Sequence, residues 1–316
     1  MENNKGELIT IVTLNPSIDR MYFLDKLNLG EVQRAKSVSI TAGGKGLNVA
    51  KVCNLLGHSP RCIGFLGGYN GKFIEGELKK ENIQSNFTYI KDETRICLNL
   101  IDKSGISTEI LEKGPTIDEE SIEVFKRTLL ESLNNTKILV VSGSIPKGID
   151  SNFYKEIGQI CESKSITYIL DASGDFLELA LSSHPFLIKP NKDELEYLTN
   201  IKIETKKDAI NAANKLISKG ANNIAVSLGK DGMLFINKEI VLDVDIPKIK
   251  AINPVGSGDA SIAGFAYGLL NDYSIEDTIK LANACGMSNA TKVKTGDIDI
   301  SQVKEFFKMI NIKTIV

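Results

Sequence analysis

The sequence predicts an α/β fold, with a central and mainly parallel sheet flanked by helices on both faces and a small β-sheet beside it. Strand-like apolar runs alternate with helix-like segments along most of the chain, which is typical of parallel sheets covered on both faces. Residues 86–112 interrupt this alternation with consecutive extended segments. The chain of 316 residues can bury a full core. We therefore expect one domain over residues 1–316, with the small sheet inserted in it.

The composition excludes several classes of function. The net charge is −2 and no basic run occurs, which argues against a nucleic-acid surface. No apolar stretch approaches the roughly 20 residues of a membrane helix, and the polar start lacks the core of a signal peptide. Five scattered cysteines without a C-x-x-C pair favour reduced thiols. We therefore expect a cytoplasmic protein that binds neither membrane nor nucleic acid.

The first third of the chain begins with the β-branched run 8–14, which predicts a buried strand. Residues 20–40 have no helical period, and short strands are expected there. The glycine-rich segment 41–48 precedes a helix with one apolar face, which ends at Gly57. Residues 61–66 are the next expected strand.

The small sheet is expected from segments that are extended but not separated by helices. Within 86–112 these segments are 87–90, 95–101 and 107–111. Together with 20–40 they would form a lid that stands off the main body.

The alternation then resumes and continues to the end of the chain. The expected strands are 137–141, 166–171, 186–189, 223–228, 234–236 and 241–244. The expected helices are 119–133, 151–163 with Ser151 as its N-cap, one that opens at Pro190, 205–219 closed by Gly220, 275–292 and 301–309.

Residues 253–259 (NPVGSGD) lead into another predicted helix, whose apolar face begins at Ile262. Glycines let bare N–H groups face a ligand, and a helix N-terminus carries partial positive charge, so this turn could hold an anion. A carboxylate, Asp259, follows in the first helical turn. Its presence beside an anion site is explained if it handles a proton or a hydroxyl group.

Other polar and glycine residues follow the carboxyl ends of expected strands, where ligands gather in parallel sheets. Each also has a structural explanation. Asp19 and the pair Gly43 and Gly44 could belong to plain turns. Asn191 could be a helix N-cap with Glu194 as its capping partner, which needs no metal. Their coincidence along one sheet edge favours a binding site.

Two segments, 42–50 (AGGKGLNVA) and 253–260 (NPVGSGDA), resemble the two signatures of the ribokinase-like (PfkB) carbohydrate kinases. Residues 15–19, 142–148 and 189–194 match further motifs, so the resemblance covers essentially the whole chain. Within the family, the chain is similar to the phosphosugar branch. One departure is the Pro-Val pair before Gly256, where many members carry threonine. The P-loop and G-x-G-x-x-G patterns are absent.

The resemblance implies a kinase mechanism. Asp259 would accept the proton of a sugar hydroxyl that attacks the γ-phosphate of ATP, and the N–H groups of Gly256, Ser257 and Gly258 would form an anion hole. The implied substrate-binding residues are Asp19, Gly43, Gly44, Lys45, Asn48, Arg95, Ser144 and Lys147. The implied ATP-binding residues are Lys189, Asn191, Ser227, Gly229, Gly232 and Asn283. Glu194 would organise Mg²⁺ through water.

Three functions remain open from the sequence. The first is phosphorylation of D-tagatose 6-phosphate to the 1,6-bisphosphate, which is favoured because residues 94–99 and 108–115 resemble those of family members that act on this sugar. The second is phosphorylation of fructose 1-phosphate to fructose 1,6-bisphosphate. The third is a sugar-phosphate sensor without catalysis, against which the intact Asp259 argues. Relatives of this kind often pair two subunits through the lid, so a homodimer is expected.

Overall fold

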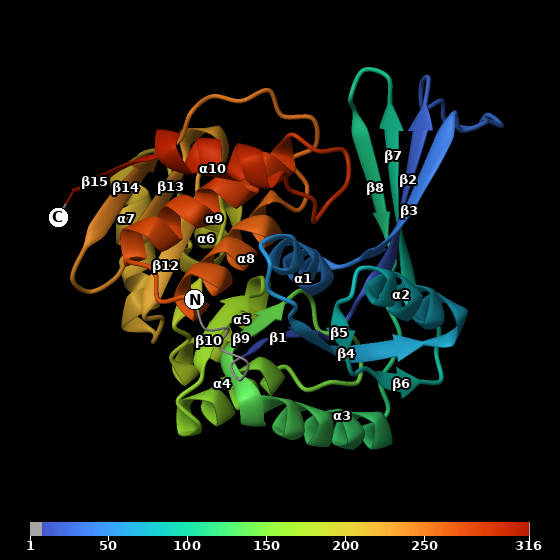
Figure 1. Cartoon of the computed structure of the whole chain (residues 1–316), viewed down its shortest axis with the longest axis horizontal. Coiled ribbons are helices and arrows are strands. Elements are labelled where there is room, and N and C mark those ends of the chain that lie inside the picture. Colours follow the sequence, from blue (N-terminus) through green and yellow to red (C-terminus); the bar gives the residue numbers. More distant parts are fainter. Residues whose placement is uncertain (1–7, 316) are drawn as a thin grey trace.

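A computed structural model describes residues 8–315, and its main body is built on one twisted sheet (Figure 1). Over the described residues this sheet has eleven strands, in the order β15-β14-β13-β12-β11-β10-β9-β1-β4-β5, with β6 beside β4. Its strands are β1 Leu8–Thr13, β4 Arg61–Gly67, β5 Gln84–Ser85, β6 Thr88–Ile90, β9 Thr136–Ser142, β10 Thr167–Asp171, β11 Leu187–Ile188, β12 Asn223–Ser227, β13 Met233–Ile236, β14 Val241–Asp245 and β15 Asn311–Thr314.

The parallel part of the sheet is buried on both faces. In β1, Ile9 and Ile11 belong to the apolar core on one face, and Val12 to the core on the other. Such alternation follows from the two-residue period of a strand. The first core is covered by α1 Lys45–Leu55, α2 Gly68–Lys80, α8 Ser257–Leu270, α9 Ile275–Ala290 and α10 Ile300–Met309. The second is covered by α3 Glu119–Ser132, α4 Phe153–Ser163, α5 Gly174–Ala180, α6 Lys192–Thr199 and α7 Lys206–Ser218.

A second sheet of four strands projects from the main body, at the upper right of Figure 1. Its order is β3 Ser37–Gly43, β2 Ser17–Leu24, β7 Arg95–Asp102 and β8 Ser107–Leu111. β2 runs parallel to β7 and antiparallel to β3. One part of the expected segment 86–112 lies elsewhere, because β6 pairs with β4 in the main sheet.

Each expected strand and helix has a counterpart, and the structure adds several that the sequence did not predict. The additional helices are α2 and α5, and the additional strands are β5 and β15, of which β15 follows the last helix. Strands β13, β14 and β15 pair antiparallel at one edge of the otherwise parallel sheet. The expected cap Ser151 is wrong: α4 has Asn152 at its N-cap position, and no side chain caps it.

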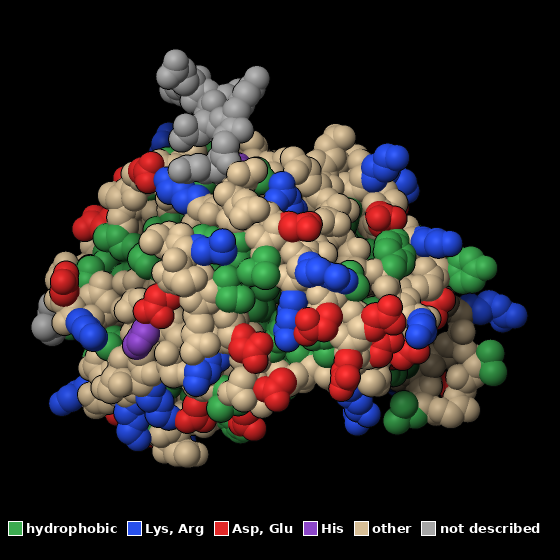
Figure 2. All heavy atoms as spheres, turned by 90° about the horizontal axis from the view of Figure 1, so that it is seen from below, with side chains coloured by type: hydrophobic (Ala, Val, Ile, Leu, Met, Phe, Trp, Pro, Cys, Tyr) green, Lys and Arg blue, Asp and Glu red, His purple; other side chains and the backbone are tan. Residues whose placement is uncertain are grey.

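The face seen from below in Figure 2 carries basic and acidic side chains interspersed, with small apolar areas between them. The five cysteines are all free and buried. Within residues 8–315, no helix is long and apolar enough to cross a membrane.

Candidate active site

The turn before α8 brings bare backbone to the carboxyl edge of the sheet. Gly256 has a left-handed φ of 80°, and a Cβ there would lie 3.1 Å from the side chain of Thr295, so glycine is strongly favoured. Asn289 of α9 fixes the turn, since its Nδ2 donates to Val255 O at 2.9 Å and its Oδ1 accepts the Gly296 N–H at 3.0 Å. The N-terminus of α8 is therefore held rigidly.

The backbone N–H groups of Gly256, Ser257 and Gly258 were expected to face an anion, and they differ in whether they are already hydrogen-bonded. The N–H of Ser257 is already engaged with Pro254 O at 3.2 Å. Those of Gly256 and Gly258 make no hydrogen bond with another described residue. A Cβ at Gly258 would lie 2.9 Å from Lys189 Nζ, so this ammonium group packs against the first turn of α8. Backbone amides, helix dipole and a lysine thus converge where an anion could bind.

Asp259 lies in that first turn and is buried, with 6% of its surface exposed. Asn48 Nδ2 of α1 donates to its Oδ2 at 2.8 Å. Burial, and then the nearby carboxylate of Asp171, raise the pKa of Asp259, although Lys45 and Asn48 act in the opposite direction. The result is a carboxyl group that can take up a proton near neutral pH.

Asp171 ends β10 beneath the same point and is also buried. Its Oδ2 lies 3.6 Å from Lys45 Nζ and accepts the Ser142 hydroxyl at 3.2 Å, and its Oδ1 lies 3.9 Å from Lys189 Nζ. Burial alone would raise the pKa of Asp171, but the two lysines and Ser142 together hold it below its usual value. Asp171 in turn raises the pKa of Lys45. Lys45 is therefore charged.

A cavity of about 360 Å³ opens on one side of α8, and the second sheet forms part of its wall. Among its lining residues are the expected substrate-side residues Asp19, Gly44, Lys45, Asn48, Arg95 and Ser144, together with Gly256 and Asp259. Lys147 does not line it. The Lys147 side chain is exposed, and its carbonyl accepts the Ile117 N–H at 2.8 Å.

Asp19 of β2 is held over the junction of β3 and α1. Ser17 Oγ donates to its Oδ1 at 2.6 Å. Gly43 does not line the cavity, but a Cβ there would lie 2.0 Å from Asp19 Cγ, so only glycine leaves room for this carboxylate. Burial raises the pKa of Asp19. The Ser17 hydroxyl, the cations Lys51 and Arg95 and the Gly44 N–H lower it, but burial outweighs them. Its geometry suits a carboxylate that accepts hydrogen bonds from hydroxyl groups.

Arg95 lies at the base of β7, at the same cavity. Its Nε donates to Asn15 O at 3.2 Å and its Nη1 to Glu112 O at 3.0 Å. These bonds fix the plane of the guanidinium group, which can pair with two oxygens of a phosphate. Ser144 nearby accepts a hydrogen bond from Asn15 Nδ2 at 3.1 Å.

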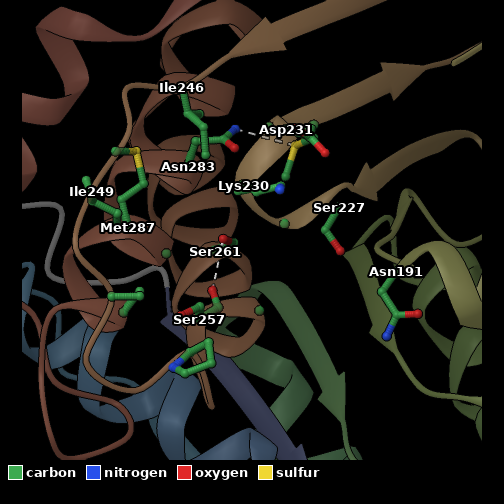
Figure 3. Close-up of a pocket in the computed structure, with 18 of the residues that line it drawn as sticks. Asn191, Ser227, Lys230, Asp231, Ile246, Ile249, Ser257, Ser261, Asn283 and Met287 are labelled. Atoms are coloured by element: carbon green, nitrogen blue, oxygen red, sulfur yellow. Dashed lines mark hydrogen bonds between the residues drawn. The ribbon is translucent and has the colours of Figure 1, made fainter. Parts of the chain in front are cut away.

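A larger cavity of about 750 Å³ opens on the other side of α8 (Figure 3). All six expected ATP-side residues line it, together with Ser257 and Gly258. Figure 3 shows Asn191 and Ser227 on one side of the cavity and Asn283 and Met287 on the other, with Ser257 at its base. A Cβ at Gly232 would lie 2.0 Å from Val244 O, so this glycine allows the hairpin to close beside the cavity.

The capping explanation of Asn191 and Glu194 is confirmed. Asn191 Oδ1 accepts the Glu194 N–H at 2.8 Å, and Glu194 Oε2 accepts the Asn191 N–H at 2.9 Å. Asn191 also lines the larger cavity, so it serves both as a cap and as cavity wall. Glu194 lines neither cavity, but its charge contributes to the raised pKa of Lys45. Within the described part of the chain, no group of three or more His, Cys, Asp or Glu side chains could hold a metal ion.

Two residues of the site were missed in the sequence. Asp171 is the last residue of an expected strand, at the edge where ligands gather, so its position was a usable signal. Asn289 lies inside an expected helix, 32 residues after Ser257, and nothing in its local sequence indicates that it fixes the turn before α8. Its role depends on the packing of α9 against α8.

Comparisons with known proteins agree with this geometry. The model of the pfkB family carbohydrate kinases matches residues 12–301. A tagatose-6-phosphate kinase of Staphylococcus epidermidis is 42% identical over 308 residues, which are 96% of this chain and 99% of that protein. The structure of phosphofructokinase-2 from Escherichia coli in complex with fructose-6-phosphate is 26% identical, with a TM-score of 0.87 over 96% of this chain and 98% of that one.

A third similar structure comes from Thermotoga maritima and is described as a possible 1-phosphofructokinase. It is 25% identical, with a TM-score of 0.89 over 98% of this chain and 100% of that one. The family model and the Staphylococcus relative each cover far more than half of the sequence. The chain belongs to the pfkB family of carbohydrate kinases.

Proposed function

We propose that this sugar kinase transfers the γ-phosphoryl group of ATP to D-tagatose 6-phosphate and forms D-tagatose 1,6-bisphosphate. The family implies ATP and a sugar as substrates. The observation that carries the proposal is the position of Asp259 at the sugar cavity, in the first turn of the helix whose Ser257 and Gly258 line the larger cavity. The identity of 42% to a tagatose-6-phosphate kinase supports the choice of sugar.

In the proposed reaction, Asp259 accepts the proton of the attacking sugar hydroxyl. Asn48 orients the carboxylate through its 2.8 Å hydrogen bond. The free N–H groups of Gly256 and Gly258, with the helix dipole, stabilise the charge on the transferring phosphoryl group. Preorganised donors of this kind contribute roughly 3–4 kcal/mol each in other enzymes.

Each cavity binds one of the two substrates in this proposal. Asp19 accepts hydrogen bonds from sugar hydroxyls, and Arg95 pairs with the phosphate that the sugar already carries. The larger cavity takes ATP, with Asn191 and Ser227 on one wall and Asn283 on the other. The second sheet supplies Asp19 and Arg95, so it acts as a lid over the sugar and keeps water out.

Magnesium would be held mainly through water and phosphate. Mg²⁺ keeps several waters and is usually bound by one or two carboxylates plus substrate phosphates. Glu194 fits this indirect kind of binding. Its capping hydrogen bond uses Oε2, and its carboxylate is close enough to raise the pKa of Lys45, which lines the sugar cavity. When bound, Mg²⁺ would neutralise charge on the phosphate oxygens.

A substrate panel tests this proposal. The purified protein is assayed with ATP and Mg²⁺ against tagatose 6-phosphate, fructose 6-phosphate and fructose 1-phosphate. We expect the highest kcat/KM with tagatose 6-phosphate. Phosphorylation of fructose 1-phosphate is the second candidate, supported by the Thermotoga maritima structure, and an equal or reversed preference for this sugar would replace the first proposal with it.

A further inference from the structure

One buried carboxylate near the phosphoryl-transfer point has no part in the mechanism above. Asp171 is 4% exposed and lines neither the sugar cavity nor the nucleotide cavity. It therefore contacts neither substrate directly. Burial of a charge is costly unless the charge is paired, and the partners of Asp171 are the ammonium groups of Lys45 and Lys189.

The two lysines come from different elements and belong to different cavities. Lys45 begins α1 and lines the sugar cavity beside Asp259. Lys189 follows β11 and lines the nucleotide cavity, with its Nζ against Gly258. The phosphoryl group must pass from the nucleotide side to the sugar side across the N-terminus of α8. Asp171 thus pairs with one cation from each cavity.

We propose that Asp171 is a positioning residue for phosphoryl transfer, which holds the ammonium groups of Lys45 and Lys189 on the two sides of the N-terminus of α8. The inference rests on the proposed function. The carboxylate oxygens of Asp171 lie 3.6 Å from Lys45 Nζ and 3.9 Å from Lys189 Nζ, farther than the roughly 2.7–2.9 Å of a tight charged hydrogen bond. Asp171 therefore fixes where the ammonium groups lie and leaves their N–H groups available for phosphate oxygens.

Three features make this arrangement rigid. Ser142 Oγ donates to Asp171 Oδ2 at 3.2 Å, so the carboxylate cannot rotate freely. The Gly143 N–H donates to the Asp171 carbonyl at 3.1 Å. Asp171 Oδ2 pairs with Lys45 and Oδ1 pairs with Lys189, so one side chain sets the distance between the two ammonium groups. In this arrangement Lys45 contacts the phosphoryl group in transfer.

The variant Asp171→Asn keeps the shape of the side chain and removes its charge. Because a small displacement of a group at the reacting centre can cost about 100-fold in rate, we expect kcat to fall by about this factor, with much smaller changes in KM for ATP and sugar. The Mg²⁺ concentration for half-maximal rate should stay unchanged. Recovery of kcat at high Mg²⁺ would overturn the inference, because Asp171 would then act as a metal ligand.

A double-mutant cycle separates positioning from a structural role. If Asp171 acts through Lys45, then Asp171→Asn should cost much less in a Lys45→Met background than in the wild type. Equal losses in both backgrounds would contradict the inference. Glu178→Gln is the matched control, because it removes a carboxylate that pairs with Lys219 at 2.6 Å on the surface and should leave kcat unchanged.

Two further measurements test the positioning role of Asp171. If Asp171→Asn does not fold, Lys45→Met and Lys189→Met should each lower kcat more than they raise either KM, and a pure KM effect would refute the inference. A crystal structure of Asp171→Asn does not depend on the identity of the sugar. It should show both ammonium groups displaced, and unchanged positions would refute the inference even if the substrate panel had failed.

Discussion

At Asp259, burial and Asp171 raise the pKa, whereas Lys45, Asn48 and Lys189 lower it, and the balance is a pKa of about 7. A general base must be deprotonated before it can accept the proton of the sugar hydroxyl. We therefore expect kcat/KM to fall about tenfold per pH unit below this value and to level off above it. The measurement is kcat/KM at saturating MgATP from pH 5 to pH 9, and a flat profile between pH 5 and pH 7 would contradict the assignment.

The variant Asp259→Asn removes the base without changing its shape. We expect kcat to fall by about 10²–10⁴-fold, the usual contribution of a general base, with modest changes in KM. Steady-state kinetics with both substrates measures this, and near-normal turnover would remove Asp259 as the base.

Thermal unfolding provides the control for this variant. The folded-state pKa of Asp259 lies above its ordinary value of 3.8. The stability that the group contributes is therefore present below pH 3.8 and is lost as the pH rises through about 7. At pH 8 the neutral asparagine should leave the melting temperature equal to or above that of the wild type. A lower melting temperature would mean that lost activity reflects damage to the fold.

The residues of the site could be predicted unequally well. Gly256 and Asp259 are neighbours in sequence, and their types alone indicate a glycine turn with a carboxylate in the following helix. The approach of Lys45 and Lys189 to Asp171 could not be predicted. It joins α1, β10 and the end of β11 through three-dimensional packing, and no local pattern records which lysine reaches which carboxylate.

Among the elements, the junction of β3 and α1 depends on the absence of one side chain. A Cβ at Gly43 would lie 2.0 Å from Asp19 Cγ, so Gly43→Ala must displace the Asp19 carboxylate. We expect KM for the sugar to rise by at least about tenfold, as for the loss of a charged hydrogen bond, with little change in KM for ATP. Gly76→Ala in α2 is the matched control, because nothing lies within 4 Å of the added Cβ. Equal kinetics of the two variants would contradict the role of Asp19.

The elements themselves were predictable where their signals are local. The helix after Pro190 begins with a capping box formed by Asn191 and Glu194, and its start follows from the sequence. Helix α2 was missed because it contains three glycines, which lower helix propensity. Its first turn is capped from a distance, since the Glu93 carboxylate accepts the N–H groups of Tyr69 and Asn70 at 3.0 and 3.1 Å.

On the scale of the whole molecule, the second sheet has one face that, over its outer half, no other part of residues 8–315 covers. Asp19 faces the sugar cavity, so by strand alternation the row Ile40, Arg20, Leu98 and Ile110 lies on the opposite face. Near the main body, Ile18 and Ala42 on this face are buried. Farther out, Ile40 is 44% and Ile110 53% exposed. Exposed apolar side chains on a sheet face, such as Ile40 and Ile110, are typical of an interface.

We propose that this face pairs two copies of the chain. The wild type should be a dimer at micromolar concentration, measured by size-exclusion chromatography with light scattering. Ile40→Lys combined with Ile110→Lys should halve the molar mass, because both lysines would place charge in the apolar contact.

Leu130→Lys is the matched control, since Leu130 is 45% exposed on α3 in the main body and its replacement should leave the dimer intact. A monomeric wild type, or a double variant that keeps the wild-type mass, would place the interface elsewhere or exclude it.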